Sequence, residues 1–246
     1  MIAGKVVAVV VPAHDEEERV GATLASMPAC VDAIVVVDDG SVDRTAAIVG
    51  ASSDARVRLV VHRRNLGVGA AIVSGYRAAF ASGADVAVVM GADGQMDPTE
   101  LASLASPVAR GEADYAKGDR LGHAQLGTMP IERRVGNVLF SALTRAMTGL
   151  TISDSQCGYT ALSRGAAARL DLDALWPGYG YPNDLLARAA DAGLRVVDVR
   201  VRPIYAGERS GIGLWEGLVV IPGVILRAGL RRAMRRARAG SVEPAE

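Results

Sequence analysis

The stretch of the chain with the clearest capacity for chemistry follows the apolar run Val88–Met90. After Gly91 come Asp93 and Gln95, and Asp97-Pro98 marks the start of a predicted helix. Oxygen ligands of this kind at the end of a strand indicate Mg²⁺ or Mn²⁺ bound to a phosphate. An Asp-Gly turn after a buried strand is also common without a metal, so the neighbouring motifs must decide between the two interpretations.

The elements that position these residues alternate between strands and helices through the first half of the chain. We expect strands at Lys5–Val11, Ala33–Val37, Val57–Val61 and Asp85–Met90, and helices at Glu16–Met27, Asp43–Val49 and Val68–Phe80. This order predicts an α/β fold with a mostly parallel sheet flanked by helices, in which loops at the carboxyl ends of the strands bind ligands. The acidic clusters of the sequence fall in those loops, at Asp15-Glu16, Asp38-Asp39 and Asp93.

The second half is more irregular. We expect a strand at 113–117, a helix at 131–147, a turn at 156–159 and a helix–strand pair at 183–199. No linker-like composition intervenes, which predicts one domain over residues 1–211, with a nucleotide half at about 1–112 and an acceptor half at about 113–211. Residues 212–238 are expected to form an amphipathic, basic helical segment, and residues 239–246 a disordered tail.

The composition bounds the class of protein. The chain has 246 residues, half of them apolar, which suits one large domain with an appendage. Lysine plus arginine and aspartate plus glutamate each number 27, so we expect no nucleic-acid partner. Cys30 and Cys157 lie far apart and no leader precedes the first strand, which favours the cytoplasm. No apolar run reaches the ~20 residues of a membrane span.

The loop after the first strand favours a nucleotide bound through a cation. Pro12–Glu17 stands where a dinucleotide-binding protein has glycines, and its acids would repel a bare phosphate. A nucleoside diphosphate here needs a divalent cation held on carboxylate, with other acids binding ribose hydroxyls and base N–H groups.

Four motifs occur in a distinctive order: Val11-Pro-Ala-His-Asp-Glu-Glu17, Val37-Asp-Asp-Gly-Ser-Val-Asp-Arg-Thr45, Asn65-Leu-Gly-Val-Gly69 and Ala92-Asp-Gly-Gln-Met-Asp-Pro98. Together they resemble the inverting family-two glycosyltransferases of GT-A fold, most closely the dolichyl- and polyprenyl-phosphate sugar synthases. The resemblance covers about Val6 to Ser210. It implies a GT-A (Rossmann-like) fold and transfer of a sugar from a UDP- or GDP-linked donor, with inversion at the anomeric carbon.

The resemblance also implies ligands for the metal and the nucleotide. Asp93 and Gln95 would hold the metal ion. Gly91 stands where the metal motif has its first acid, so more of the coordination should fall to water and diphosphate oxygens. The nucleotide-sugar site would comprise Pro12, Ala13, His14, Glu16, Asp38, Asp39, Asn65, Gly67, Asp93 and Arg209.

The catalytic residues that the resemblance implies are Asp93, Arg120, Arg134, Asp154 and Asp184. The two arginines would hold acceptor and donor phosphates, for which guanidinium groups are suited. Asp154 would be an acceptor-loop acid, and Asp184 would lie near the usual place of a catalytic base. The alternatives are surface arginines beside a helix, a turn-forming Asp154 and a helix-start Asp184.

The carboxyl-terminal segment joins an apolar stretch to a basic one. Leu214–Leu226 is followed by Arg227, Arg231, Arg232, Arg235, Arg236 and Arg238. Such a pair suits an anchor at a membrane surface, where arginines meet anionic lipid. A packed closing helix and a homodimer contact are the alternatives.

The sequence thus predicts a metal-dependent inverting hexosyltransferase that uses Mg²⁺ or Mn²⁺ and acts on polyprenyl phosphate, peripheral on the inner, cytoplasmic face of a membrane. A soluble glycosyltransferase with a sugar, small-molecule or peptide acceptor would share every nucleotide motif. A nucleotidyltransferase and a non-catalytic nucleotide-sugar-binding domain are further alternatives. Neither the sugar nor the nucleotide base follows from the motifs.

Overall fold

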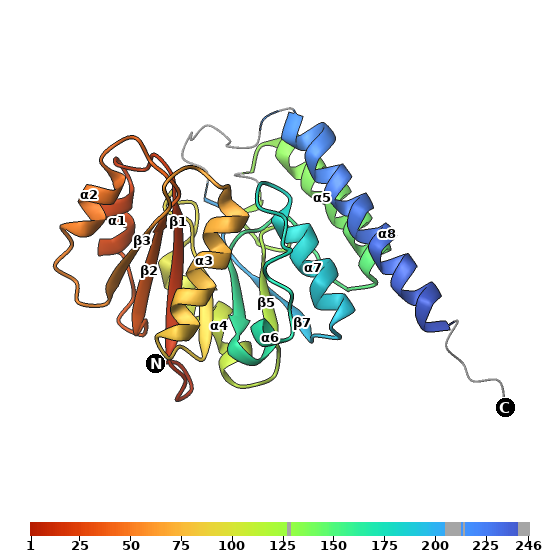
Figure 1. Cartoon of the computed structure of the whole chain (residues 1–246), viewed down its shortest axis with the longest axis horizontal. Coiled ribbons are helices and arrows are strands. Elements are labelled where there is room, and N and C mark those ends of the chain that lie inside the picture. The colour runs from red at the N-terminus through yellow and green to blue at the C-terminus, as the bar shows by residue number, and fades with distance from the viewer. Residues whose placement is uncertain (127–128, 205–212, 214, 241–246) are drawn as a thin grey trace.

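One sheet of seven strands runs through the part of the chain that the structure describes (Figure 1). The computed structural model describes residues 1–126, 129–204, 213 and 215–240, with side chains up to residue 234. Strands β1 to β7 span Val7–Ala13, Ala33–Asp38, Val57–Val61, Val86–Val89, Tyr115–Asp119, Thr160–Ser163 and Val196–Arg200. Their order is β3-β2-β1-β4-β6-β5-β7; β6 runs antiparallel to both neighbours, whereas the other pairings are parallel.

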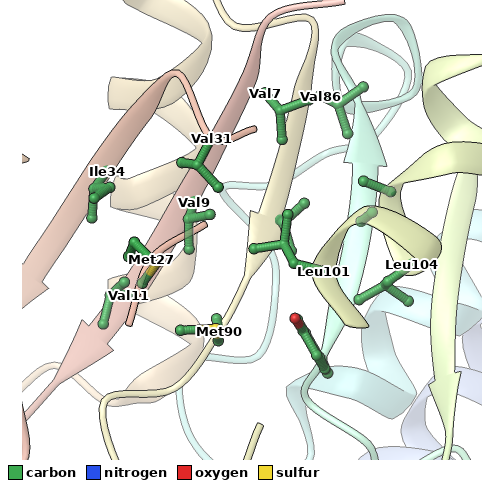
Figure 2. Packing of buried hydrophobic residues seen from close by; sticks show 14 of the residues in the cluster. Val7, Val9, Val11, Met27, Val31, Ile34, Val86, Met90, Leu101 and Leu104 are labelled. Carbon is green, nitrogen blue, oxygen red and sulfur yellow. The ribbon is translucent and has the colours of Figure 1, made fainter. Parts of the chain in front are cut away.

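Helices cover both faces of the sheet, because its central strands are apolar on both sides. In β1, Val9 packs on one face and Val10 on the other, as expected for a parallel sheet between two helical layers. The face of Val9 is covered by α1 (Val20–Ala25), α2 (Thr45–Gly50) and α4 (Leu101–Ala109), and Figure 2 shows Leu101 and Leu104 in this layer. The face of Val10 is covered by α3 (Val68–Ala81), α6 (Arg164–Ala168) and α7 (Tyr181–Asp191).

Two long helices lie outside these layers. α5 (Ile131–Thr148) and α8 (Ile221–Gly240) pack against each other and against α7, side by side at one end of the molecule (Figure 1). A π-helical turn, η3 (Glu216–Val220), leads into α8. Among the described residues, no helix is long and apolar enough to cross a membrane. The tail expected at 239–246 falls mainly on residues 241–246, which lie outside the described residues.

The predicted α/β fold is confirmed, with differences in individual elements. The helix expected from Glu16 begins at Val20, because Asp15 has a positive φ of 54° and the residues after it form turns. A short 3-10 helix, η1 (Pro98–Glu100), precedes α4, where the sequence predicts a helix start at Asp97-Pro98. The sequence predicts neither β6 nor α6, which have four and five residues.

Candidate active site

The carboxyl ends of β1, β2, β4 and β5 open onto a large cavity. Its volume is about 1480 Å³, and it extends from the loops after these strands to α5 and η3. The four strands point the same way, because β6 reverses direction between β4 and β5. The loops that carry the sequence motifs therefore meet at one edge of the sheet.

Two carboxylates face the cavity from neighbouring strands. Asp93 follows β4 and Glu16 follows β1, and both line the cavity. Burial, and then the negative charge of Asp93, raise the pKa of Glu16 above its ordinary value. An oxygen of Glu16 is buried without a hydrogen bond, with the Arg19 guanidinium 3.6 Å away. A positive charge between the two acids would stabilise both.

These donors fit a hard divalent cation. Asp93 accepts the backbone N–H of Gln95 at 3.0 Å, so one turn presents both side chains to the cavity. Carboxylate and amide oxygens are ligands that Mg²⁺ and Mn²⁺ take. Across the described part of the chain, no group of three or more His, Cys, Asp or Glu residues could hold a metal, so water or a diphosphate would supply the remaining ligands. At Gly91, a Cβ would lie 3.1 Å from an oxygen of Asp93.

Asp39 fixes the loop that follows β3. Its carboxylate accepts the backbone N–H groups of Leu66 at 2.9 Å and Gly67 at 2.8 Å. It also pairs with His62 Nδ1 at 2.7 Å, and the other ring nitrogen of His62 contacts Ser74 Oγ at 2.9 Å. Because Asp39 lines the cavity, these contacts set the wall against which a nucleoside would bind. No sequence motif includes His62, because its contact with Asp39 joins residues that lie 23 positions apart in the sequence.

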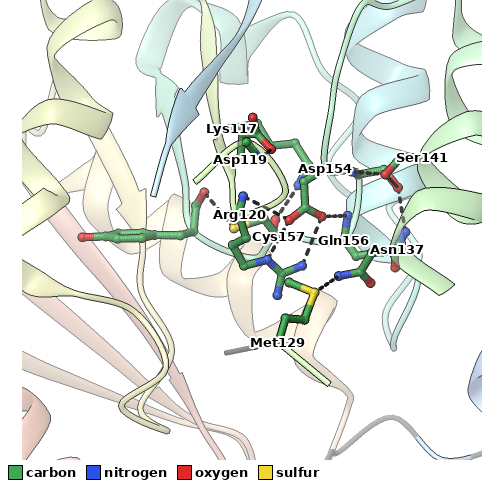
Figure 3. Close-up of polar contacts among 12 residues, drawn as sticks. Lys117, Asp119, Arg120, Met129, Asn137, Ser141, Asp154, Gln156 and Cys157 are labelled. Atoms are coloured by element: carbon green, nitrogen blue, oxygen red, sulfur yellow. Dashed lines mark hydrogen bonds and ion pairs between the residues drawn. The ribbon is translucent and has the colours of Figure 1, made fainter. Parts of the chain in front are cut away.

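Arg120 enters the cavity from the end of β5 and is held by a buried acid. Its Nε and one terminal nitrogen donate to the two oxygens of Asp154 at 2.7 and 3.1 Å, as Figure 3 shows. Burial, the largest single effect, would raise the pKa of Asp154, but the charge and hydrogen bonds of Arg120, the charge of Lys117 and the backbone N–H of Gln156 together outweigh it, so the pKa is lowered. The buried Lys117 donates to the carbonyl of Cys157, and burial lowers the pKa of its ammonium. Asp154 therefore positions Arg120 instead of facing the cavity.

A buried hydrogen-bond network joins this corner to α5 and α7. The backbone N–H of Ser155 donates to Ser141 Oγ at 2.8 Å. Gln156 Nε2 donates to Ser155 Oγ at 2.8 Å and to Asn183 Oδ1 at 3.0 Å, and Asn183 Nδ2 donates to Thr144 Oγ1 at 2.7 Å. These hydrogen bonds fix α5 and α7 relative to the loop before β6. Gln156, a member of the network, also lines the cavity.

The part of the cavity formed by the outer helices carries several large apolar side chains beside the polar Glu132, Arg133 and Asn137. α5 contributes Val135, Leu139 and Leu143, and Leu218 and Ile221 come from η3 and the start of α8. The helical spacing of the three α5 residues is a sequence signal for one shared face. The loop before α7 also lines the cavity, at residues 178–180, and no motif marks it.

Most of the predicted nucleotide and metal residues lie together along the cavity. They are Pro12, Ala13, His14, Glu16, Asp39, Asn65, Gly67, Asp93 and Gln95. Asp38 is buried at the end of β2 and is not part of the lining. Arg209 lies outside the described residues.

Three of the predicted catalytic residues do not line the cavity: Asp154, which binds Arg120 as described above, Arg134 and Asp184. Arg134 is exposed, whereas its neighbour Arg133 lines the cavity, because successive residues of a helix face directions about 100° apart. Asp184, expected near a catalytic base, is buried between helices instead. Its carboxylate accepts from Arg188 and from Arg231, each at 2.9 Å. As the alternative interpretation expects, Asp184 is an acid at the start of a helix, and its carboxylate also joins α7 to α8.

Known proteins resemble this chain over most of its length. Residues 8–171 match Glycosyl transferase family 2. The polyprenol monophosphomannose synthase of Mycolicibacterium smegmatis is 32% identical over 238 residues, which cover 92% of this chain and 89% of that protein. The UDP-N-acetylglucosamine–dolichyl-phosphate N-acetylglucosaminyltransferase of Methanococcus voltae is 29% identical over 220 residues, which cover 83% of this chain and 88% of that protein.

A solved structure shares the fold. The glucosyl-3-phosphoglycerate synthase of Mycobacterium tuberculosis, in complex with Mn²⁺, UDP and glucosyl-3-phosphoglycerate, superposes with a TM-score of 0.69. The two chains are 24% identical, and the match covers 92% of this chain and 80% of that one. This likeness confirms the predicted GT-A fold. Since the family match spans the strands and motifs that build the nucleotide end of the cavity, the chain belongs to glycosyl transferase family 2.

Proposed function

We propose that this protein transfers a sugar from a nucleotide-diphosphate sugar to polyprenyl phosphate, with inversion at the anomeric carbon. The observation that carries the proposal is that acidic, basic and apolar side chains line different parts of one continuous cavity. Acids at the ends of β1, β2 and β4, the guanidinium groups of Arg120 and Arg133, and apolar side chains of α5 and η3 share this space. A sugar nucleotide and a lipid phosphate together present the matching chemistry.

The acidic end suits the donor. Asp39 and the loop it holds would bind the nucleoside, and Asp93 with Gln95 would hold Mg²⁺ or Mn²⁺ at the diphosphate. Bound there, the cation would supply positive charge that stabilises the departing nucleoside diphosphate. The first residue of α3, Val68, lines the same space, so the positive end of that helix dipole is also available to an anion.

The arginines and the apolar wall suit the acceptor. Arg120 and Arg133 would bind the acceptor phosphate, for which guanidinium groups offer paired N–H donors. The isoprenoid chain would lie against Val135, Leu139 and Leu218. A soluble sugar acceptor would leave this apolar surface without a partner.

The chemistry is a single displacement. An oxygen of the acceptor phosphate attacks the anomeric carbon, and the bond from that carbon to the diphosphate breaks, with its electron pair leaving on the nucleoside diphosphate. A phosphate monoester has a second pKa of about 6, so the attacking oxygen is ionised near neutral pH without a protein base. This step therefore does not need Asp184, which lies away from the cavity.

The relatives support the same assignment through their own activities. One is named a dolichyl-phosphate N-acetylglucosaminyltransferase and another a polyprenol monophosphomannose synthase. The solved synthase of the same fold contains Mn²⁺ together with UDP. These names favour a polyprenyl phosphate acceptor and a divalent cation for this chain.

We further infer that the protein binds peripherally to the cytoplasmic face of a membrane. Large apolar side chains are exposed at helical spacing on the neighbouring helices α5 and α8: Ile131, Val135, Val138, Leu139, Leu226, Leu230 and Met234. Such faces can enter the headgroup layer of a bilayer. Arg227, Arg231 and Arg232 contact the domain, so apolar area supports this inference more than charge does.

A transfer assay tests the proposed function. The purified protein is incubated with Mn²⁺, radiolabelled UDP- and GDP-sugars, and either undecaprenyl phosphate in detergent or soluble sugar acceptors. We expect a lipid-extractable glycosyl phosphate from one donor. Asp93→Asn should lower its rate by about 100-fold or more, because the charge stabilisation lost is worth several kcal/mol. The exposed Asp173→Asn serves as the control.

Two outcomes would count against the proposal. Transfer to a soluble acceptor, with none to the lipid phosphate, would contradict the acceptor. No transfer from any donor, with either Mg²⁺ or Mn²⁺, would contradict the enzymatic function itself.

A further inference from the structure

Asp184 lies at a junction of three elements, in the first turn of α7. Its Oδ2 accepts the backbone N–H of Trp176 at 3.0 Å and Nε of Arg188 at 2.9 Å. Its Oδ1 accepts from Arg231 of α8 at 2.9 Å. The carboxylate is buried, where hydrogen bonds of this kind are stronger than in water. One side chain thus joins α8 to the loop that precedes α7.

That loop is packed against the start of α3. The carbonyl of Pro177 accepts the N–H of Ala70 at 3.1 Å, one of the donors that the first turn of a helix leaves unpaired. Gly67 and Gly69 allow the two backbones to approach, since a Cβ at either would lie under 3.0 Å from a carbonyl oxygen of Trp176 or Pro177. A shift of Trp176-Pro177 must therefore move the first turn of α3.

The first turn of α3 belongs to the nucleotide end of the cavity. Gly67 lines the cavity, and its N–H donates to the carboxylate of Asp39 at 2.8 Å. α8 touches the same loop at a second point, because the Arg227 guanidinium lies 5.8 Å from the centre of the Trp176 ring. The contacts form an unbroken path from α8, through the loop, to the residues that face the donor.

We propose that Asp184 is a positioning residue that transmits the seating of α8 to the nucleotide-binding loop, so that affinity for a nucleoside diphosphate depends on the Asp184–Arg231 contact. The identity of the ligand rests on the proposed function. With Arg231 in place, Trp176-Pro177 is held and the first turn of α3 is ordered for the diphosphate. Without the Arg231 side chain, the first turn of α3 opens more often, and part of the binding free energy of the nucleotide is used to close it.

The chain offers a matched control in the next residue of α8. Arg232 also pairs with an acid of α7, donating to Asp191 at 2.9 Å, and it is buried to a similar extent as Arg231. Among the described residues, no hydrogen bond or ion pair joins Arg232 to Asp184 or to the loop before α7. Arg232→Gln removes an ion pair with Asp191, whereas Arg231→Gln removes the pair with Asp184 and a longer one with Asp191 at 3.8 Å. Only the contact with Asp184 lies on the proposed path.

Two measurements follow the path in the full chain. Hydrogen exchange, read by mass spectrometry on peptides covering residues 65–71, reports the opening of the Ala70 N–H without any ligand. Calorimetric titration with UDP and with GDP, each with Mn²⁺, reports affinity. Arg231→Gln should speed exchange in this segment by about tenfold and weaken the preferred nucleotide by about fivefold or more. Arg232→Gln should change both by less than about twofold, and Arg231→Lys should recover part of the loss.

The proposal is overturned if Arg231→Gln and Arg232→Gln change the exchange rate of residues 65–71 to the same extent, or if neither variant changes it. If Arg231→Gln does not fold, Arg227→Gln replaces it, because Arg227 is exposed and its loss should still speed exchange. A wild-type protein that binds neither nucleotide would contradict the proposed function. The exchange comparison would still decide whether α8 is coupled to α3.

Discussion

Carboxylates in and around the cavity differ in role because their partners differ. Asp93 shares its surroundings with a second acid, Glu16, which favours a cation between them. Asp154 is matched by Arg120, and Asp184 by two arginines. Asp154 and Asp184, which are buried and pair with arginines, position other groups, whereas Glu16 and Asp93 line the cavity where a ligand would bind.

Gly91→Asp tests the metal site at its missing acid. A Cβ at this position would lie 3.1 Å from Asp93, so the new carboxylate should repel Asp93 and destabilise the cation-free protein by about 1–2 kcal/mol. Mn²⁺ should restore that stability and should bind more tightly than to the wild type. Thermal unfolding with and without Mn²⁺ measures both effects. Gly91→Ala, which adds the Cβ alone, is the control, and an equal response to Mn²⁺ in the two variants would contradict a cation site next to position 91.

Asp154→Asn tests the buried ion pair. Because it leaves Arg120 without its counter-charge, we expect a loss of about 3 kcal/mol in the free energy of unfolding at pH 7. The pKa of Asp154 is lowered in the folded state, so its contribution is complete above about pH 4 and is lost as the pH falls through the folded-state value. Urea unfolding between pH 3 and pH 7 should show the gap to wild type closing at the acid end. A gap that stays constant would contradict this assignment.

The sequence motifs bring most of the residues predicted to bind nucleotide to one cavity, because each motif lies at or after the carboxyl end of a strand. They do not locate residues whose position depends on helix phase or on distant contacts. Arg133 and Arg134 differ by one helical step, which the motif cannot resolve. Asp184 sits near the expected place in the sequence, yet Arg231 and Trp176 draw its carboxylate away from the cavity.

At the scale of elements, the strands that are easiest to predict are those buried on both faces. β1 and β4 are runs dominated by valine, and their predicted bounds fall close to the observed ones. β6 has the sequence Thr-Ala-Leu-Ser and is too short to show a period. It is a strand because β4 and β5 flank it, which is a tertiary effect.

The exposed apolar side chains of α8 can be tested for membrane binding. Leu226→Glu combined with Leu230→Glu removes two exposed apolar side chains of α8 and should weaken binding to anionic lipid vesicles by about tenfold or more. Vesicle flotation measures the binding, and calorimetric titration should show unchanged affinity for nucleotide. Val42→Glu is the control, since Val42 is 91% exposed in the loop after β2, remote in sequence from both helices. Equal flotation of both variants would contradict membrane binding through α8.

At the scale of the whole molecule, one sheet carries both parts of the cavity. The acidic loops of the cavity follow β1, β2 and β4, while Arg120 follows β5 on the far side of β6. The core packs on both faces of this sheet from β1 to β7. Occupation of the cavity should therefore stabilise the fold as a unit.

Thermal unfolding with nucleotide tests this expectation. UDP or GDP with Mn²⁺, at about 100 times its Kd, should add about 2.7 kcal/mol and raise the Tm by about 5 °C or more. With EDTA in place of Mn²⁺ the increase should be much smaller, because the acids then repel the diphosphate. A preference for one base would identify the donor. An equal increase with EDTA would contradict the role proposed for the cation.

The reversal of β6 has a consequence for how such proteins diversify. The acidic loops of the cavity follow their strands, whereas the segment 154–159 lies at the same edge of the sheet just before β6 begins. A replacement of this segment alone should change the lining at Gln156 and Gly158 and leave the loops after β1, β2 and β4 in place. The antiparallel strand β6 thus separates two groups of loops around one cavity, and we expect sequence changes in one group to leave the other group in place.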